Sequence, residues 1–184
     1  MAEGRDERFW DRDGAALRTP RLEIRRPRGA DAPDMASAAN DPRIAANMRD
    51  AFPSPYTIED AREWIELAGA SGWRGLSIAC DGRVIGGIGL HPGEDVHRFD
   101  AELGYWLGVD HWGVGYASEA VAAFCDHAFA QTVLQRLHAV VFHGNPASDR
   151  VLEKCGFVLE GLSRRAIFKN GRFLDCRTYA RLKV

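Results

Sequence analysis

Two glycines, Gly113 and Gly115, separate an apolar strand pattern from an alanine-rich helical pattern. The strand pattern is AELGYWLGV at residues 101–109, and the helical pattern has apolar residues three and four apart after Gly115. Glycine lets a backbone turn approach a ligand closely, and the first N–H groups of a helix have no hydrogen-bond partner within the helix. Because the helix dipole adds partial positive charge there, the segment HWGVGYASEA predicts an anion-binding turn.

Two nucleotide-binding motifs fail to match this turn. A phosphate-binding P-loop requires Gly-Lys followed by Ser or Thr, which HWGVGYASEA lacks. The dinucleotide motif GxGxxG fails because Ser118 replaces its third glycine, and no acidic residue ends a clear second strand about 20 residues later. A simple glycine corner that joins a strand to a helix remains the alternative to anion binding.

Hydrophobic periodicity elsewhere predicts a mixed α/β domain. Apolar runs on either side of Asp81-Gly82 predict a β-hairpin, because that pair tolerates positive φ angles. Gly86, Gly87 and Gly89 lie in its second strand, where glycine often marks a bulge or the close approach of another backbone. The other predicted strands lie within residues 17–27, 101–109, 136–143 and 157–182, and the predicted helices within 31–42, 57–69, 115–128 and 145–156.

Capping residues support these predicted helices. Asp31 is placed to cap the first helix, and Thr57 with Asp60 three residues later has the spacing of a reciprocal cap. Asn145 fits the start of the last helix, and Gly156 fits its end in the left-handed conformation.

Length and composition indicate one globular domain. The 184 residues are 46% hydrophobic and 27% charged, and we expect residues 14–184 to form the domain and residues 1–13 a mobile tail. The net charge of −2 gives no global attraction for nucleic acid or an anionic membrane, and the chain shows no membrane-spanning apolar run and no signal peptide. Four isolated cysteines and six histidines without ligand spacing predict free thiols, no metal site and a cytoplasmic location.

Three strings in order carry a family resemblance: AELGYWLG, HWGVGYASEA and NPASDRVLEKCGF. Together they resemble the GNAT superfamily of acetyl-CoA-dependent N-acetyltransferases and, within it, the RimJ/RimL-like branch. The motif agreement covers roughly residues 100–160, and the flanking strand pattern extends it to about 20–182. The resemblance implies an α/β fold with a twisted, mostly antiparallel central sheet of about six or seven strands, a splayed parallel strand pair and about four flanking helices.

The resemblance also implies acetyl-CoA as co-substrate. Its diphosphate would lie on the glycine turn, and its pantetheine arm would pair with free backbone groups at the end of strand 101–109. Two departures reduce side-chain contacts to phosphate: Trp112 replaces a basic or amide residue, and Val114 stands where relatives often carry Lys or Gln. The implied cofactor-binding residues are Leu107, Gly108, Val109, Val114, Gly115, Tyr116, Ala117, Asn145 and Arg150.

Acetyl transfer requires a neutral amine, and Glu102 resembles the family's catalytic glutamate. Strand alternation places Glu102 on one face with Gly104 and Trp106. It would act as the general base, directly or through water, or it would only bind the acceptor ammonium. A plain salt bridge on the strand is the remaining interpretation.

The departing thiolate needs a hydrogen-bond donor, and Ser148 occupies the branch's serine position for that role. Tyr116 and Tyr179 are alternative phenol donors. Asn145 and Ser148 also suit an ordinary helix start, and Arg150 also suits a solvated helix face.

The acceptor side depends on the connecting segments. Phe52, Tyr56 and Trp106 are the candidate acceptor-binding residues, and Trp73 is a further candidate for the apolar groove, although aromatic residues beside prolines often serve packing alone. The acidic loop at 94–100, which includes Asp100, either attracts a cationic amine or is simply solvated. The resemblance implies a small-molecule amine or a protein N-terminus as acceptor, and it leaves a homodimer open. The alternative function is a non-catalytic acetyl-CoA-binding regulatory module on the same fold.

Overall fold

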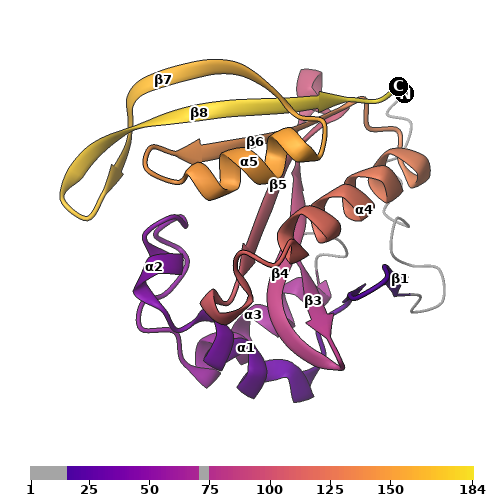
Figure 1. Ribbon diagram of the computed structural model, residues 1–184, viewed down its shortest axis with the longest axis vertical. Helices are drawn as coiled ribbons and strands as arrows, with labels where there is room; N and C mark the ends of the chain where they lie inside the picture. Colours follow the sequence, from indigo (N-terminus) through magenta and orange to yellow (C-terminus); the bar gives the residue numbers. More distant parts are fainter. Residues whose placement is uncertain (1–15, 71–74) are drawn as a thin grey trace.

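An eight-stranded sheet runs through the part of the chain that the computed structural model describes, residues 16–70 and 75–184 (Figure 1). Its strand order is β1-β2-β3-β4-β5-β6-β8-β7, and neighbouring strands are antiparallel except for the parallel pair β5 and β6. The strands are β1 (Leu17–Arg18), β2 (Glu23–Arg25), β3 (Leu76–Cys80), β4 (Arg83–Pro92), β5 (Asp100–Leu107), β6 (Arg136–Phe142), β7 (Val158–Lys169) and β8 (Arg172–Leu182). The α-helices are α1 (Ala32–Ala39), α2 (Pro42–Ala45), α3 (Ile58–Ala70), α4 (Tyr116–Gln131) and α5 (Pro146–Lys154).

The mixed α/β class and the parallel strand pair agree with the prediction, whereas the element counts differ. The described residues form eight strands and five α-helices, against about seven and four predicted. The extra elements are short: β1 has two residues and α2 has four, too few for a hydrophobic period to show. The predicted mobile tail, residues 1–13, lies outside the described residues. Within the described ranges, no helix is long and apolar enough to cross a membrane.

Helices cover both faces of the sheet. The larger core includes Phe124 of α4 and Leu137 of β6, and α4 and α5 run along this face (Figure 1). On the opposite face, α1 and α3 enclose a smaller core around Met35. β5 contributes to both layers, because Leu103 belongs to the larger core while Trp106 packs against the smaller one. The predicted alternation of β5 side chains therefore holds.

The predicted caps hold at two helices and fail at one. Thr57 and Asp60 form a reciprocal cap, with bonds of 2.7 and 3.2 Å between each side chain and the other's backbone N–H. Asn145 caps α5 by accepting from the backbone N–H three residues later at 3.2 Å. Asp31 is the N-cap residue of α1 as predicted, but its side chain makes no capping bond: the carboxylate instead accepts two hydrogen bonds, at 2.7 and 2.8 Å, from the buried guanidinium of Arg25. A buried arginine requires a charged partner, and that need outweighs capping.

A bulge in β4 explains one of the glycines in that strand. The pairing of β3 with β4 skips Ile85, so the ladder is disrupted locally. The next residue, Gly86, lies directly against β5. A Cβ built on Gly86 would overlap the carbonyl oxygen of Trp106 and lie 2.6 Å from Cδ2 of Leu107. Gly86 is therefore needed for the close approach of β4 and β5.

Replacing Gly86 with alanine should destabilise the fold. The added Cβ must displace the β5 backbone, and overfilling of this kind costs about 1–3 kcal/mol. Urea unfolding followed by circular dichroism measures the free energy of unfolding. Gly161→Ala is the matched control, because a Cβ on this strand residue meets no atom within 4 Å. Equal losses in both variants would contradict the close approach at Gly86.

Candidate active site

The parallel pairing of β5 with β6 is short. It comprises Asp100 with Arg136, Ala101 with Leu137, and Glu102 with His138. Beyond that point β5 continues along β4 until Leu107 pairs with Gly86, while β6 continues along β8 until Phe142 pairs with Cys176. The two strands therefore part after Glu102, as the predicted splayed pair requires (Figure 1).

Asp100 joins the two strands where they pair. Its Oδ2 accepts from Nη1 of Arg136 at 2.8 Å, and its Oδ1 lies 3.0 Å from Nδ1 of His138. Arg136 also forms an ion pair with Glu160 of β7. Asp100 is thus a partnered residue of β5 and not a solvated loop residue, which corrects that interpretation of it.

The predicted anion-binding turn has the backbone geometry that the prediction requires. Gly113 and Gly115 have φ angles of 79° and 89°, in the left-handed region that favours glycine, and α4 begins at the next residue, Tyr116. Gly115 is the N-cap residue and has no side chain with which to bond the first N–H groups of α4. A Cβ on Gly113 would meet no atom within 4 Å, so the turn has open space beside it.

Arg21, from the connection between β1 and β2, braces this turn. Its Nη1 donates to the carbonyl oxygen of Val114 at 3.0 Å, and its Cζ lies 4.6 Å from the centre of the Tyr116 ring. Glu119, in the first turn of α4, accepts from Nε of Arg21 at 2.7 Å and from the Thr19 hydroxyl at 2.6 Å. Arg21 and Glu119 are 98 positions apart, so folding brings a cation to the turn that the motif itself lacks.

The carbonyl groups at the end of β5 are engaged within the protein, contrary to the predicted free groups. The Leu107 carbonyl accepts the indole N–H of Trp112 at 2.9 Å. The Gly108 carbonyl accepts the N–H of His111 at 2.9 Å, and the Val109 carbonyl accepts the N–H of Trp112 at 3.2 Å. Trp112 therefore fixes the strand end, a different use of the position where relatives carry a basic or amide residue.

A hydrogen bond between hydroxyl groups places Ser148 beside β5. The hydroxyl oxygens of Ser148 and Tyr105 are 2.6 Å apart. Tyr105 lies on the opposite face of β5 from Glu102, because consecutive odd and even strand residues alternate. Burial raises the pKa of the Tyr105 phenol far above its ordinary value, so the phenol keeps its proton at neutral pH.

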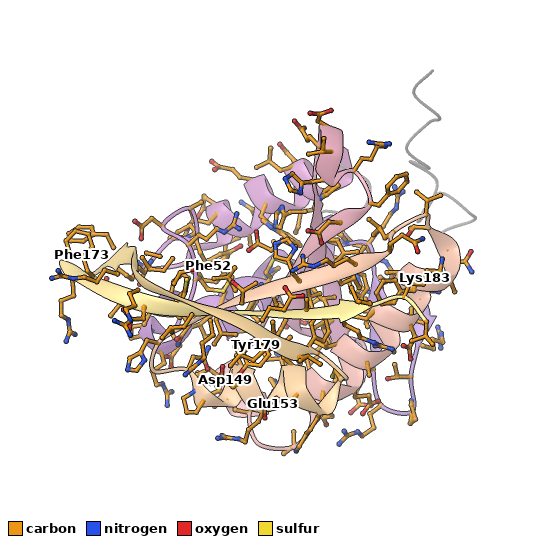
Figure 2. The ribbon with its side chains drawn as sticks, turned by 90° about the horizontal axis from the view of Figure 1, so that it is seen from above. Phe52, Asp149, Glu153, Phe173, Tyr179 and Lys183 are labelled. Carbon is orange, nitrogen blue, oxygen red and sulfur yellow. The ribbon has the colours of Figure 1, made fainter. Side chains whose placement is uncertain are left out.

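The two predicted phenol alternatives take other partners. Tyr116 lies with its hydroxyl 3.6 Å from Sγ of Cys80. Tyr179 of β8 lies beside Asp149 of α5 (Figure 2), and Asp149 forms a two-bond ion pair with Arg177 at 2.6 and 3.1 Å. This ion pair anchors α5 to β8, and the hydroxyl group bonded to Ser148 is that of Tyr105.

Glu102 forms an ion pair with Arg49, which lies in the connection between α2 and α3. Its Oε2 accepts from Nη2 of Arg49 at 2.5 Å, and the side chains are 25% and 64% exposed. The salt bridge expected as one interpretation of Glu102 is therefore present. Its roles as a base or as an acceptor ligand stay predictions.

The predicted acceptor residues Phe52, Tyr56 and Trp106 line a single pocket of about 240 Å³. The ring centre of Phe52 lies 5.0 Å from that of Tyr56 and 5.7 Å from that of Trp106. Gly104 also lines the pocket and is two residues from Glu102 on β5. Folding thus brings the three aromatic residues together next to the candidate base.

Of the remaining predicted residues, Trp73 lies outside the described part of the chain. Arg150 is an exposed residue of α5. The four cysteines Cys80, Cys125, Cys155 and Cys176 are free thiols, as predicted. In the described part of the chain, no group of three or more His, Cys, Asp or Glu side chains could hold a metal ion.

Residues 21–158 match the family model of the acetyltransferase (GNAT) domain. The chain is 32% identical over 174 residues to the uncharacterized N-acetyltransferase p20 of Bacillus licheniformis, covering 91% of this chain and 96% of p20. It is 40% identical over 100 residues to the uncharacterized N-acetyltransferase YoaA of Bacillus subtilis, a match that spans 54% of this chain and only 56% of YoaA. The chain belongs to the GNAT acetyltransferase family, and the prediction of an acyltransferase is confirmed at the level of the family.

Relatives from the ribosomal-protein acetyltransferases agree with the RimJ/RimL-like branch. The ribosomal-protein-serine acetyltransferase of Escherichia coli is 35% identical over 99 residues, 54% of this chain and 55% of that protein. The structure of RimL, a ribosomal L7/L12 α-N-protein acetyltransferase in complex with coenzyme A, superposes with a TM-score of 0.80 at 22% identity and covers 91% of this chain and 98% of RimL. At that identity the superposition shows a shared fold.

Sequence reasoning missed three residues of the site: Arg21, Arg49 and Tyr105. Arg21 and Arg49 have no local pattern that points to the turn or to Glu102, because each meets its partner through long-range folding. For Tyr105, the sequence pattern did contain an indication of its role. Its place on the face of β5 opposite to Glu102 could have indicated a role toward the last helix.

Replacing Glu119 with glutamine should weaken the brace at neutral pH. Burial acts to raise the pKa of Glu119, but hydrogen bonds from Thr19 and Arg21 outweigh it and lower that pKa below its ordinary value. Such a carboxylate stabilises the fold above its unfolded-state pKa of about 4.3, and the contribution is lost as pH falls through the folded-state pKa. Thermal unfolding should show a wild-type advantage above about pH 5 that shrinks below about pH 4.

Glu66→Gln, at an exposed position of α3, is the control for the removal of a glutamate charge. A difference between wild type and Glu119→Gln that stays constant across the pH series would contradict a brace that depends on the Glu119 charge.

Proposed function

We propose that this chain is an acetyl-CoA-dependent N-acetyltransferase that moves an acetyl group directly to a primary amine. One arrangement carries the proposal: β5 and β6 part after Glu102, α4 begins nearby at a glycine turn, and Ser148 of α5 is bonded to Tyr105 of β5. The family membership supports this reading, because relatives are named as N-acetyltransferases.

The glycine turn fits a diphosphate group. Gly113 and Gly115 have left-handed φ angles and no side chains, and the space beside Gly113 is open, so a ligand can approach the backbone of the turn. The start of the 16-residue helix α4 favours an anion. When bound, acetyl-CoA supplies the activated acetyl thioester. The residues that would hold it are Val114, Gly115, Tyr116 and Ala117 at the diphosphate, and Asn145 and Arg150 on the α5 side. The carbonyls of Leu107, Gly108 and Val109 each accept one hydrogen bond within the protein, so the strand end would offer the pantetheine arm only their second lone pairs.

Glu102 is the residue that we assign to removing the proton of the amine. At pH 7 an α-amino group with a pKa near 8 loses its proton at a cost of about 1.4 kcal/mol, whereas an alkylamine near 10.4 costs about 4.6 kcal/mol. A base therefore matters most for alkylamines. Arg49 must move away from Oε2 before that oxygen can accept a proton from the amine or from a bridging water.

Ser148 is the residue that we assign to the departing thiolate. Tyr105 keeps its proton and can donate it to Oγ of Ser148, which leaves the serine's own hydrogen to point toward the sulfur. A positioned donor stabilises negative charge that develops in the transition state and then delivers the proton. The pair thus presents one oriented hydroxyl donor on the α5 side of β5.

One observation favours the non-catalytic alternative. Glu102 is ion-paired with Arg49, so a cation already occupies one oxygen of the candidate base. A regulatory module of this kind would bind acetyl-CoA without turnover and would tolerate substitution of Glu102 and Ser148.

We also propose the kind of acceptor, the extent of the domain and the cellular location. A protein N-terminus as acceptor is supported by the relative named for ribosomal-protein serine, and a small-molecule amine is equally compatible with the fold. We propose that residues 14–184 act as one domain and that the protein works in the cytoplasm, which the four free cysteines support.

Replacing Ser148 with alanine should lower kcat by about 10²-fold, because a positioned proton donor typically contributes at least that much. Tyr105→Phe should cause a smaller loss, since the serine hydroxyl remains. Calorimetric titration should show that both variants keep their affinity for acetyl-CoA. Ser163→Ala, at an exposed position of β7, is the matched control. Near-normal turnover of Ser148→Ala would remove the serine from the mechanism.

Replacing Glu102 with glutamine should change how turnover depends on pH. Without a base, the rate should follow the neutral fraction of the amine and rise about tenfold per pH unit up to the amine pKa. Wild-type turnover should vary less over the same range. Steady-state kinetics between pH 6 and pH 9 provides the measurement, and identical turnover of both enzymes at every pH would contradict both proposed roles of Glu102.

A further inference from the structure

The pocket of about 240 Å³ lies beside the candidate base. Its floor is formed by β4 and β5, and its walls by residues 48–56 and by α3. Gly104 and His91 both line it: Gly104 is two residues from Glu102 on β5, and His91 is the partner of Glu102 on β4. A molecule that fills this pocket therefore lies next to Glu102.

The lining of the pocket is mostly aromatic and aliphatic. Phe52 stands between the other rings, with its centre 5.0 Å from that of Tyr56 and 5.7 Å from that of Trp106. Burial raises the pKa of Tyr56 to about 12, so its phenol is uncharged at neutral pH. Further apolar lining comes from Met48, Trp64, Leu67 and Ile88.

The carboxylates of the pocket lie on one wall. Among the residues that the structure describes, the lining includes no Lys or Arg, and its carboxylates are Asp60 and Glu63 of α3. Asp60 accepts two hydrogen bonds of 2.7 Å from Thr57, and Glu102 is paired with Arg49. A second ammonium group of a polyamine would have to reach the α3 wall, because a charge is costly to bury against the apolar rings.

The volume suits one ring on a short chain. An apolar cavity of about 150 Å³ accommodates benzene, so about 240 Å³ leaves room for a few further atoms. Gly104 leaves part of the floor open, because a Cβ there would meet no atom within 4 Å. A hydroxyl-rich sugar would find few hydrogen-bond partners on such a surface, and unpaired buried hydroxyl groups weaken binding.

We propose that the acceptor is a primary monoamine joined by a short chain to an apolar or aromatic group. A free arylalkylamine and the N-terminal residue of a peptide with an aromatic side chain both carry this chemistry. The inference rests on the proposed N-acetyltransferase function and names its substrate class. The apolar group occupies the pocket that Phe52, Tyr56 and Trp106 line, and the amine faces Glu102.

Steady-state acetylation of four acceptors tests the substrate class: phenethylamine, a tetrapeptide that begins with phenylalanine, the same peptide beginning with serine, and spermidine. We expect kcat/KM for the better of the two aromatic acceptors to exceed that of serine peptide and spermidine by at least about tenfold, because burial of a ring is worth that much. The ratio between the two aromatic acceptors identifies the free amine or the peptide end as the source. Preference for spermidine or for the serine peptide would overturn the inference.

Phe52→Ala supplies the test of position. It should lower kcat/KM for the preferred aromatic acceptor by about tenfold, mainly by raising KM. The kcat/KM for the serine peptide should change by less than about twofold. Phe168→Ala, which removes an exposed ring of β7, is the matched control. An equal loss for every acceptor would overturn the assignment of the pocket.

A binding measurement separates this inference from the proposed function. Phenethylamine added to the protein without acetyl-CoA should give a saturable change in tryptophan fluorescence, because Trp64 and Trp106 line the pocket, and Phe52→Ala should abolish it. Binding without acetylation of any acceptor would refute the proposed function and support the ligand class. Acetylation of spermidine without phenethylamine binding would support the function and overturn the ligand class.

Discussion

The contact on which the site depends is the bridge that Asp100 makes from β5 to β6. Its two carboxylate oxygens contact Arg136 and His138 at 2.8 and 3.0 Å, at the end of the sheet where the two strands pair. Further along, each strand follows its other neighbour, β4 or β8. Partly buried charges are screened less than exposed ones, so this bridge can fix the start of the splay while the rest of the interface stays unpaired.

The splay gives β5 two separate tasks. Because its side chains alternate, Glu102 shares a face of β5 with Trp106, which lines the pocket beside α3, while Tyr105 bonds to Ser148 of α5. A base for the amine and a donor for the thiolate can thus act on opposite faces of one strand. The glycine turn at the start of α4 fixes the third position, where the phosphates would lie. Under the proposed function, the amine, the thioester and the phosphates would therefore lie in that order.

Local signals in the sequence predicted the local features. The glycine turn at 113–115 and the cap at Asn145 follow from residues that lie within a few positions of one another. Long-range contacts could not be predicted in this way. Arg21 contacts Glu119 of α4 and Arg49 contacts Glu102, and no short sequence motif links either pair. Asp31 shows a different limit, because its carboxylate bonds to Arg25, six residues earlier, and the burial of that arginine is decided by the fold.

The central claim is that the glycine turn and the splayed strands together form an acetyl-CoA site. Calorimetric titration of the purified chain with acetyl-CoA tests it directly, with NADH as the control ligand. The account predicts saturable micromolar binding of acetyl-CoA and no binding of NADH. Absence of acetyl-CoA binding near millimolar concentration would contradict it, and HWGVGYASEA would then be only the corner at which a strand meets a helix.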